Sequence, residues 1–141
     1  MIQRIQSIWL FLAALMAAGL LYFKLYTYNS PKGIEEVYVS SGLGFLVLAI
    51  ILIILPLVAL FMFKNRKRQK GLAILNIIAA IGFIAATVMR VTSVKNDAPL
   101  SNSTSYGIGA VLPVAIIVFT ALAINDIRKD EKLVKSLDRL R

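Results

Sequence analysis

Few side chains in this sequence could do chemistry, and they lie apart from one another. The chain has no His and no Cys, which removes thiol nucleophiles and the commonest metal ligands. Glu35 and Glu36 are adjacent, so their side chains point apart on regular structure, which is poor geometry for acid–base catalysis. We therefore identify no catalytic, cofactor-binding or metal-binding set, and we expect a protein that is not an enzyme.

The acidic residues all fall outside the apolar runs of the chain: Glu35, Glu36, Asp97, Asp126, Asp130, Glu131 and Asp138. A proton- or cation-coupled transporter usually keeps a carboxylate at mid-membrane, and none is placed there. Asn76 is the one strongly polar side chain inside an apolar run. We expect it to make a hydrogen bond between helices, with a pore or substrate role as the alternative.

These residues are positioned by long apolar segments. Of the 141 residues, 59% are apolar and 16% charged, whereas a soluble domain has about 25% charged residues. A helix of roughly 20 apolar residues crosses a hydrocarbon core about 30 Å thick. The uncharged intervals predict spans at 5–23, 42–63, 71–89 and 107–125. The fold class is thus all-α: a polytopic membrane protein with a four-helix bundle over 1–125.

The first span has an alternative, a cleaved signal peptide, because Arg4 precedes an apolar run. That run exceeds the usual length of about 7–15 residues, and no small-x-small cleavage site follows Phe23. We therefore expect the segment to be retained as a span.

The basic residues flank the spans unequally. Twelve of the 16 Lys and Arg residues fall on one side, and Lys24, Lys32, Arg90 and Lys95 fall on the other. The positive-inside rule makes the richer side cytoplasmic, with both termini there. This predicts a multi-pass protein of a bacterial inner membrane, whose net charge of +9 serves topology and contact with anionic lipid rather than nucleic acid.

Small residues mark candidate helix contacts. Ala13 and Ala17 lie four apart in the first span, as do Gly82 and Ala86 in the third, and such pairs let backbones approach closely in lipid. The contacts could lie within the bundle or with an external helix. Glycine pairs also open the second and fourth spans, at 42–44 and 107–109; we weigh a duplicated hairpin against coincidence and favour coincidence.

The polar segments between spans read as connectors. Residues 27–41 contain a strong turn signal at 29–33, and residues 90–106 read as a mobile loop. Residues 126–141 form a basic amphipathic cytoplasmic tail, expected as a helix continuing from the fourth span. Leu133, Leu137 and Leu140 are spaced as one narrow stripe. The tail either rests on the anionic inner surface of the membrane or docks on a cytoplasmic protein or a second copy.

Three stretches are similar to a known family: the opening residues 1–6, the inner loop 64–69 and the ending 127–141. They resemble the Bacteroidota family catalogued as domain of unknown function 4293, over the whole chain. The resemblance implies a four-helix inner-membrane protein and supplies no activity and no site residues.

The functional expectation is a non-enzymatic accessory or scaffold bundle for a membrane assembly. Its partners would be the lipid bilayer, anionic lipid at the cytoplasmic face, and a membrane protein or a second copy. The alternative is a small transporter or channel subunit that works as an oligomer, motivated by Asn76 and by Pro56 and Pro113 in two spans. A membrane enzyme ranks third.

Overall fold

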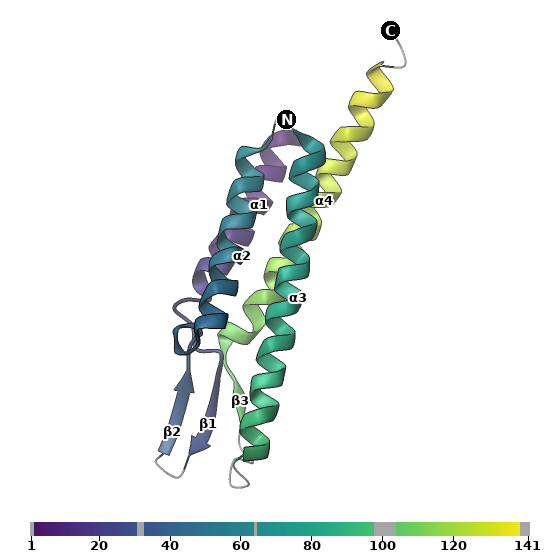
Figure 1. Cartoon of the computed structure of the whole chain (residues 1–141). Coiled ribbons are helices and arrows are strands. Elements are labelled where there is room, and N and C mark those ends of the chain that lie inside the picture. The colour runs from purple at the N-terminus through teal and green to yellow at the C-terminus, as the bar shows by residue number, and fades with distance from the viewer. Residues whose placement is uncertain (1, 31–32, 64, 98–103, 139–141) are drawn as a thin grey trace.

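Four helices run up and down to form a bundle (Figure 1). The computed structural model describes residues 2–30, 33–63, 65–97 and 104–138. The helices are α1 (Ile2–Gly19), α2 (Leu43–Phe61), α3 (Arg66–Asp97) and α4 (Ile108–Asp138). Neighbours in the sequence are neighbours in space, and α4 closes the ring by packing on α1. Short connections between antiparallel helices favour this arrangement.

Three of the helices are long and apolar enough to cross a membrane, over Leu43–Phe61, Arg66–Lys95 and Ile108–Val134. In the first helix the apolar stretch Ile5–Gly19 is shorter. The large apolar side chains are mostly on the outside of the bundle, among them Phe11, Ile54 and Ile78. Small residues such as Ala49 and Ala80 are fully buried. This distribution suits helices that contact one another through small side chains and contact lipid through large ones.

A small β-sheet at one end of the bundle corrects the all-α prediction. Strands β1 (Tyr26–Ser30), β2 (Gly33–Val37) and β3 (Ser105–Tyr106) pair antiparallel in the order β2-β1-β3. A short 3-10 helix, η1 (Val39–Ser41), leads into α2. The turn signal at 29–33 was a hairpin signal, because Tyr, Thr, Ile and Val flank it and these residues favour strands.

The helices α3 and α4 extend beyond the apolar runs. Residues 90–97 were expected in a loop, and they instead complete α3. Residues 126–138 continue α4 without a break, as expected for the tail; residues 139–141 lie outside the described part of the chain. Polar helix ends like these retain their backbone hydrogen bonds after the apolar run has ended, so hydropathy alone places the boundary too early.

The start of α4 is packed against the chain that leaves α1. The Gly107 amide donates to the Leu25 carbonyl across 2.8 Å, and the Gly109 amide donates to the Lys24 carbonyl across 3.0 Å. A Cβ at Gly107 or Gly109 would lie 2.3 or 2.7 Å from that Lys24 oxygen, whereas one at Gly44 would meet nothing within 4 Å. The two glycine pairs therefore play different structural roles, and this close approach accounts for the second pair.

Candidate functional site at the basic end of the bundle

Asp126 of α4 is held by two side chains of α1. The indole Nε1 of Trp9 donates to Asp126 Oδ2 across 3.1 Å, and Gln6 Nε2 donates to the Asp126 backbone carbonyl across 3.3 Å. Gln6 is buried, with 4% of its surface exposed. Residues three apart lie on one face of a helix, so α1 presents both donors to α4. The Trp9 ring also stacks on Phe119, with 5.9 Å between ring centroids.

Asp130, one helical turn further along α4, is held from the other side by α3. Arg66 Nη2 lies 3.1 Å from Asp130 Oδ2, and Arg66 Nη1 donates to the Asp130 carbonyl oxygen across 3.3 Å. Arg66 is the first residue of α3. Lys129 Nζ lies 3.6 Å from Asp126 Oδ1. A guanidinium that contacts two oxygens at once fixes geometry better than a point charge does, so the base of the α4 extension is clamped between α1 and α3.

A polar contact crosses the bundle at mid-length, between α3 and α4. Asn76, fully buried, donates from Nδ2 to Thr120 Oγ1 across 3.0 Å, and Thr120 in turn donates to the Ile116 carbonyl across 2.7 Å. Asn76 Oδ1 is buried and has no hydrogen-bond partner among the described residues. An unpartnered buried acceptor is unfavourable by about 1–3 kcal/mol, so the contact orients the two helices at an energetic cost.

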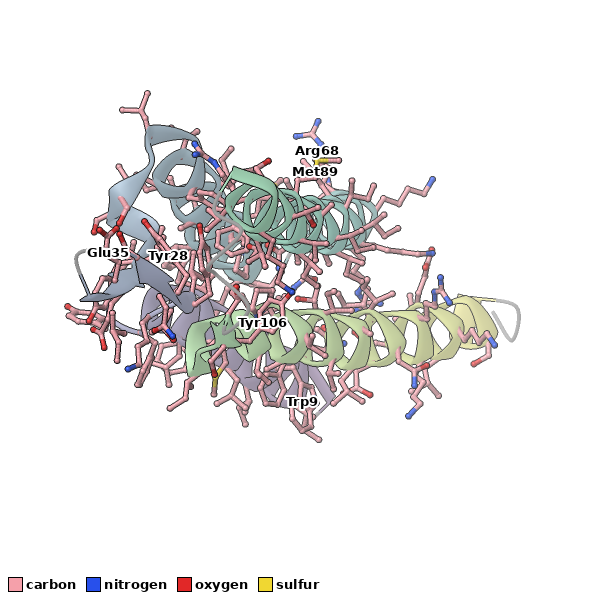
Figure 2. All side chains as sticks on the ribbon, turned by 90° about the horizontal axis from the view of Figure 1, so that it is seen from below. Trp9, Tyr28, Glu35, Arg68, Met89 and Tyr106 are labelled. Carbon is pink, nitrogen blue, oxygen red and sulfur yellow. The ribbon has the colours of Figure 1, made fainter. Side chains whose placement is uncertain are left out.

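The opposite end carries a network of tyrosines and carboxylates on the sheet. Tyr28 donates its hydroxyl proton to Glu35, the residue directly across from it in the sheet (Figure 2). Glu36 accepts from Lys24 across 2.9 Å and from Tyr38 across 2.8 Å. The two adjacent carboxylates thus have separate partners, on opposite faces of β2, as the alternation of a strand requires.

These contacts set the ionisation of the sheet end. Hydrogen bonds from Lys24 and Tyr38, with the Lys24 charge, lower the pKa of Glu36. The hydrogen bond and the charge of Glu36 raise the pKa of Lys24. The hydrogen bond to Glu35 is the main cause that raises the pKa of Tyr28. Because an exposed ion pair contributes little to stability, this network fixes the local geometry of the sheet more than it stabilises the fold.

The residues predicted to pack helices lie in different environments. Ala13 and Ala17 are fully buried, on the face of α1 that also carries Gln6. Ala86 is partly buried against the core. Gly82 is exposed, and a Cβ there would meet nothing within 4 Å. None of the described residues packs against this position of Gly82, and a role toward an external helix stays a prediction.

The predicted tail stripe lies at the free end of α4. Leu133 is 50% exposed, and its neighbour Val134 is 39% exposed. The backbone of α4 includes Leu137, but its side chain, and Leu140 altogether, lie outside the described residues. The exposed apolar pair is accompanied by exposed Lys132.

The contacts at the basic end hold the base of the α4 extension against α1 and α3. In the described part of the chain, no three His, Cys, Asp or Glu side chains gather where they could hold a metal ion. Sequence reasoning missed the clamp formed by Trp9, Asp126, Arg66 and Asp130. A usable signal was present: Trp9 and Asp126 stand at the same depth, near the same ends of their apolar runs.

The comparisons agree with the resemblance noted in the sequence. The model of the family described as Domain of unknown function (DUF4293) matches residues 2–140, so the chain belongs to that family. No curated protein and no solved structure matches the chain.

Proposed function

We propose that this member of the DUF4293 family is a non-enzymatic accessory protein that spans a membrane four times and presents a fixed, basic helix to a cytoplasmic partner. The observation that carries the proposal is α4, which runs unbroken over Ile108–Asp138 and is clamped at Asp126 and Asp130. A clamped helix meets a partner in one orientation, so little ordering entropy is lost on binding.

We count α1 as a fourth span beside the three long apolar helices. The apolar stretch Ile5–Gly19 of α1 rises about 22 Å, and the uncharged residues 20–23 that follow it extend it toward the width of a hydrocarbon core, about 30 Å. The beginning of α1, the α2–α3 connection and the free end of α4 lie at one end of the bundle (Figure 1), together with Arg66, Lys67 and Arg68. The positive-inside rule then supports a cytoplasmic location for that end, in the inner membrane of a bacterium.

The direction of α4 favours a protein partner over the membrane surface. An amphipathic helix that rests on lipid lies in the plane of the interface. Here the free end of α4 projects beyond the ends of the other three helices and continues along its own axis (Figure 1). Its exposed Leu133 and Val134 are thereby carried away from the bilayer, where a cytoplasmic protein or a second copy can contact them.

Single cysteines test the orientation, because the chain has none of its own. Lys67→Cys in the basic end and Asn29→Cys in the sheet are labelled in intact cells with a membrane-impermeant maleimide. We expect Asn29→Cys to be labelled from outside and Lys67→Cys only after lysis. Labelling of Lys67→Cys in intact cells would overturn the proposed topology.

Site-specific photocrosslinking tests the partner. A benzophenone side chain at Leu133 is compared with one at Val118, which is also 50% exposed but lies on the apolar part of α4. We expect a discrete adduct with one protein, or with a second copy, from position 133 only. Equal adducts from both positions, or none from 133 in native membranes, would count against a docking helix.

A second candidate, a small transporter or channel subunit, is supported by the unpartnered Asn76 Oδ1 at mid-bundle. A pathway formed on oligomerisation would use this acceptor to contact a solute. The test is flux of ions or metabolites into reconstituted vesicles, with Asn76→Leu as the variant. Flux that Asn76→Leu abolishes would favour this candidate over the scaffold.

A further inference from the structure

Two adjoining hollows lie between α3 and α4 near the basic end. The larger, about 650 Å³, is lined mainly by apolar side chains, with Ile74 and Ile77 from α3 facing Ile117 and Leu122 from α4. The smaller, about 390 Å³, is lined by charged side chains. Both are lined by Asn125 and Arg128, so together they form one groove with an apolar floor and a charged mouth.

The mouth carries a surplus of positive charge. Its charged lining consists of four cations, Lys70, Arg128, Lys129 and Lys132, and one carboxylate, Glu131. The nearby carboxylates of Asp126 and Asp130 already face Lys129 and Arg66. The other three cations of the mouth, Lys70, Arg128 and Lys132, share it with the Glu131 carboxylate. Four cations and the two carboxylates of Glu131 and Asp126 leave a surplus of two positive charges for an anion that enters the mouth.

The charged mouth and the apolar floor follow one another along α3 and α4 in the order that the headgroup and acyl chain of an amphiphile would require. Lys70 and Arg128 stand where the apolar runs of α3 and α4 give way to polar residues, which is the level of lipid headgroups. The isoleucine-lined floor extends from there toward mid-membrane. A soluble anion would leave this floor empty, and an apolar peptide would leave the cations without counter-charge. A phospholipid uses both parts, with its phosphate at the mouth and an acyl chain along the floor.

We propose that this groove binds an anionic phospholipid, and that the surplus of two positive charges selects a headgroup with two phosphates, of the diphosphatidylglycerol class. Arg128 and Lys70 contact the phosphates from the two sides of the groove. The site differs from the exposed face at Leu133, so lipid binding and partner docking can fail independently.

Native mass spectrometry of the full chain in detergent tests the site, with diphosphatidylglycerol, phosphatidylglycerol and phosphatidylcholine as the lipids added. We expect one diphosphatidylglycerol retained per chain, less phosphatidylglycerol, and phosphatidylcholine least. Lys70→Gln with Arg128→Gln should weaken retention about 25-fold, since each nearby cation contributes a factor of about five. The matched control is Lys67→Gln with Arg68→Gln, which removes the same charge at the same end outside the groove, and it should retain the lipid.

A second pair of variants tests the apolar floor without changing charge. Ala121→Trp fills the floor and should reduce retention, whereas Ile78→Trp on the exposed face of α3 should not. Glycerol phosphate at millimolar concentration should fail to displace the lipid, because it has no acyl chain. Equal losses for both charge pairs would indicate diffuse surface attraction and overturn the proposal, as would equal retention of phosphatidylcholine or no effect of Ala121→Trp. An unaltered helical circular dichroism spectrum shows that each variant is folded.

Discussion

Trp9 donates its indole proton to the Asp126 carboxylate across 3.1 Å, joining two residues 117 positions apart in the chain. The contact is only part-buried, yet it fixes the point at which α4 leaves the bundle. An aromatic ring with one donor suits this position, because its apolar body packs on Phe119 while its edge reaches a carboxylate.

Replacing Trp9 with Phe removes the hydrogen-bond donor to Asp126 and keeps an aromatic ring against Phe119, so it separates the hydrogen bond from the packing. We expect Trp9→Phe to lower the free energy of unfolding by about 1.5–3 kcal/mol, the usual contribution of a hydrogen bond to a charged group. Thermal unfolding in detergent, combined with Asp126→Asn in a double-mutant cycle, measures the coupling. Additive effects of the two substitutions would show that the hydrogen bond contributes nothing to stability.

The glycines at the start of α4 should tolerate no side chain. Gly107→Ala or Gly109→Ala places a methyl group against the Lys24 carbonyl oxygen, and the backbone shift needed should lower stability by about 1–3 kcal/mol. Gly44→Ala is the matched control, because the space around it is open; it should leave stability unchanged or raise it by up to about 1 kcal/mol. Denaturation midpoints of the three variants give the comparison, and equal midpoints would refute the close approach.

Substitutions at the two buried residues Asn76 and Thr120 should change the free energy of unfolding by different amounts. We expect Asn76→Leu to change stability by less than about 1 kcal/mol, since it removes the unpartnered Oδ1 while Thr120 keeps its bond to the Ile116 carbonyl. Thr120→Val instead leaves the Asn76 amide without its acceptor, and should destabilise the fold by about 1–3 kcal/mol. Unfolding in a urea or dodecyl sulfate titration distinguishes the two. A larger loss for Asn76→Leu than for Thr120→Val would contradict this account.

The contribution of the ion pair between Lys24 and Glu36 to stability should be confined to a defined pH range. The pKa of Glu36 is lowered from 4.5, so the contribution of its carboxylate is present above that value and is lost as pH falls through the lowered pKa. The pKa of Lys24 is raised from 10.5, so its contribution is present below that value and is lost as pH rises through the raised pKa.

An NMR titration of the glutamate carboxyl carbons measures this window. Glu36 should titrate below 4.5, and Lys24→Met should move its midpoint upward, because the largest cause of the shift is removed. Lys95→Met, which removes an exposed charge from α3, is the control and should leave the midpoint in place. An unchanged midpoint in Lys24→Met would show that the ion pair does not form in solution.

The helices could be predicted from the sequence because charged residues bound each apolar run, and each run is long enough for one helix of about 20 residues. The sheet could not be read in the same way. Strand β1 pairs with β3 across 78 residues, as in the Thr27 and Ser105 register, and β3 is two residues long. No local pattern specifies a partner that short and that distant, although the Tyr and Thr residues of β1 did mark strand-forming sequence.

The clamp at the basic end was missed for a different reason. The helix was expected to continue through Asp126 and Asp130, but its contacts were not: α4 brings one carboxylate toward α1 and the other toward α3. Their role depends on which way each face of α4 turns. The sequence predicts that these carboxylates lie beyond the end of the apolar run. Whether they face solvent or a neighbouring helix depends on how the helices pack.

The antiparallel pairing of β1 with β3 also has a consequence for biogenesis. Residues 24–27 complete their hydrogen bonds only after 105–109 have been synthesised, because β3 pairs with residues 26–27 and the Gly107 and Gly109 amides donate to the Leu25 and Lys24 carbonyls. Until then one edge of β1 lacks its partner strand. A ribosome stalled after α3 would leave that edge available to any extended chain nearby.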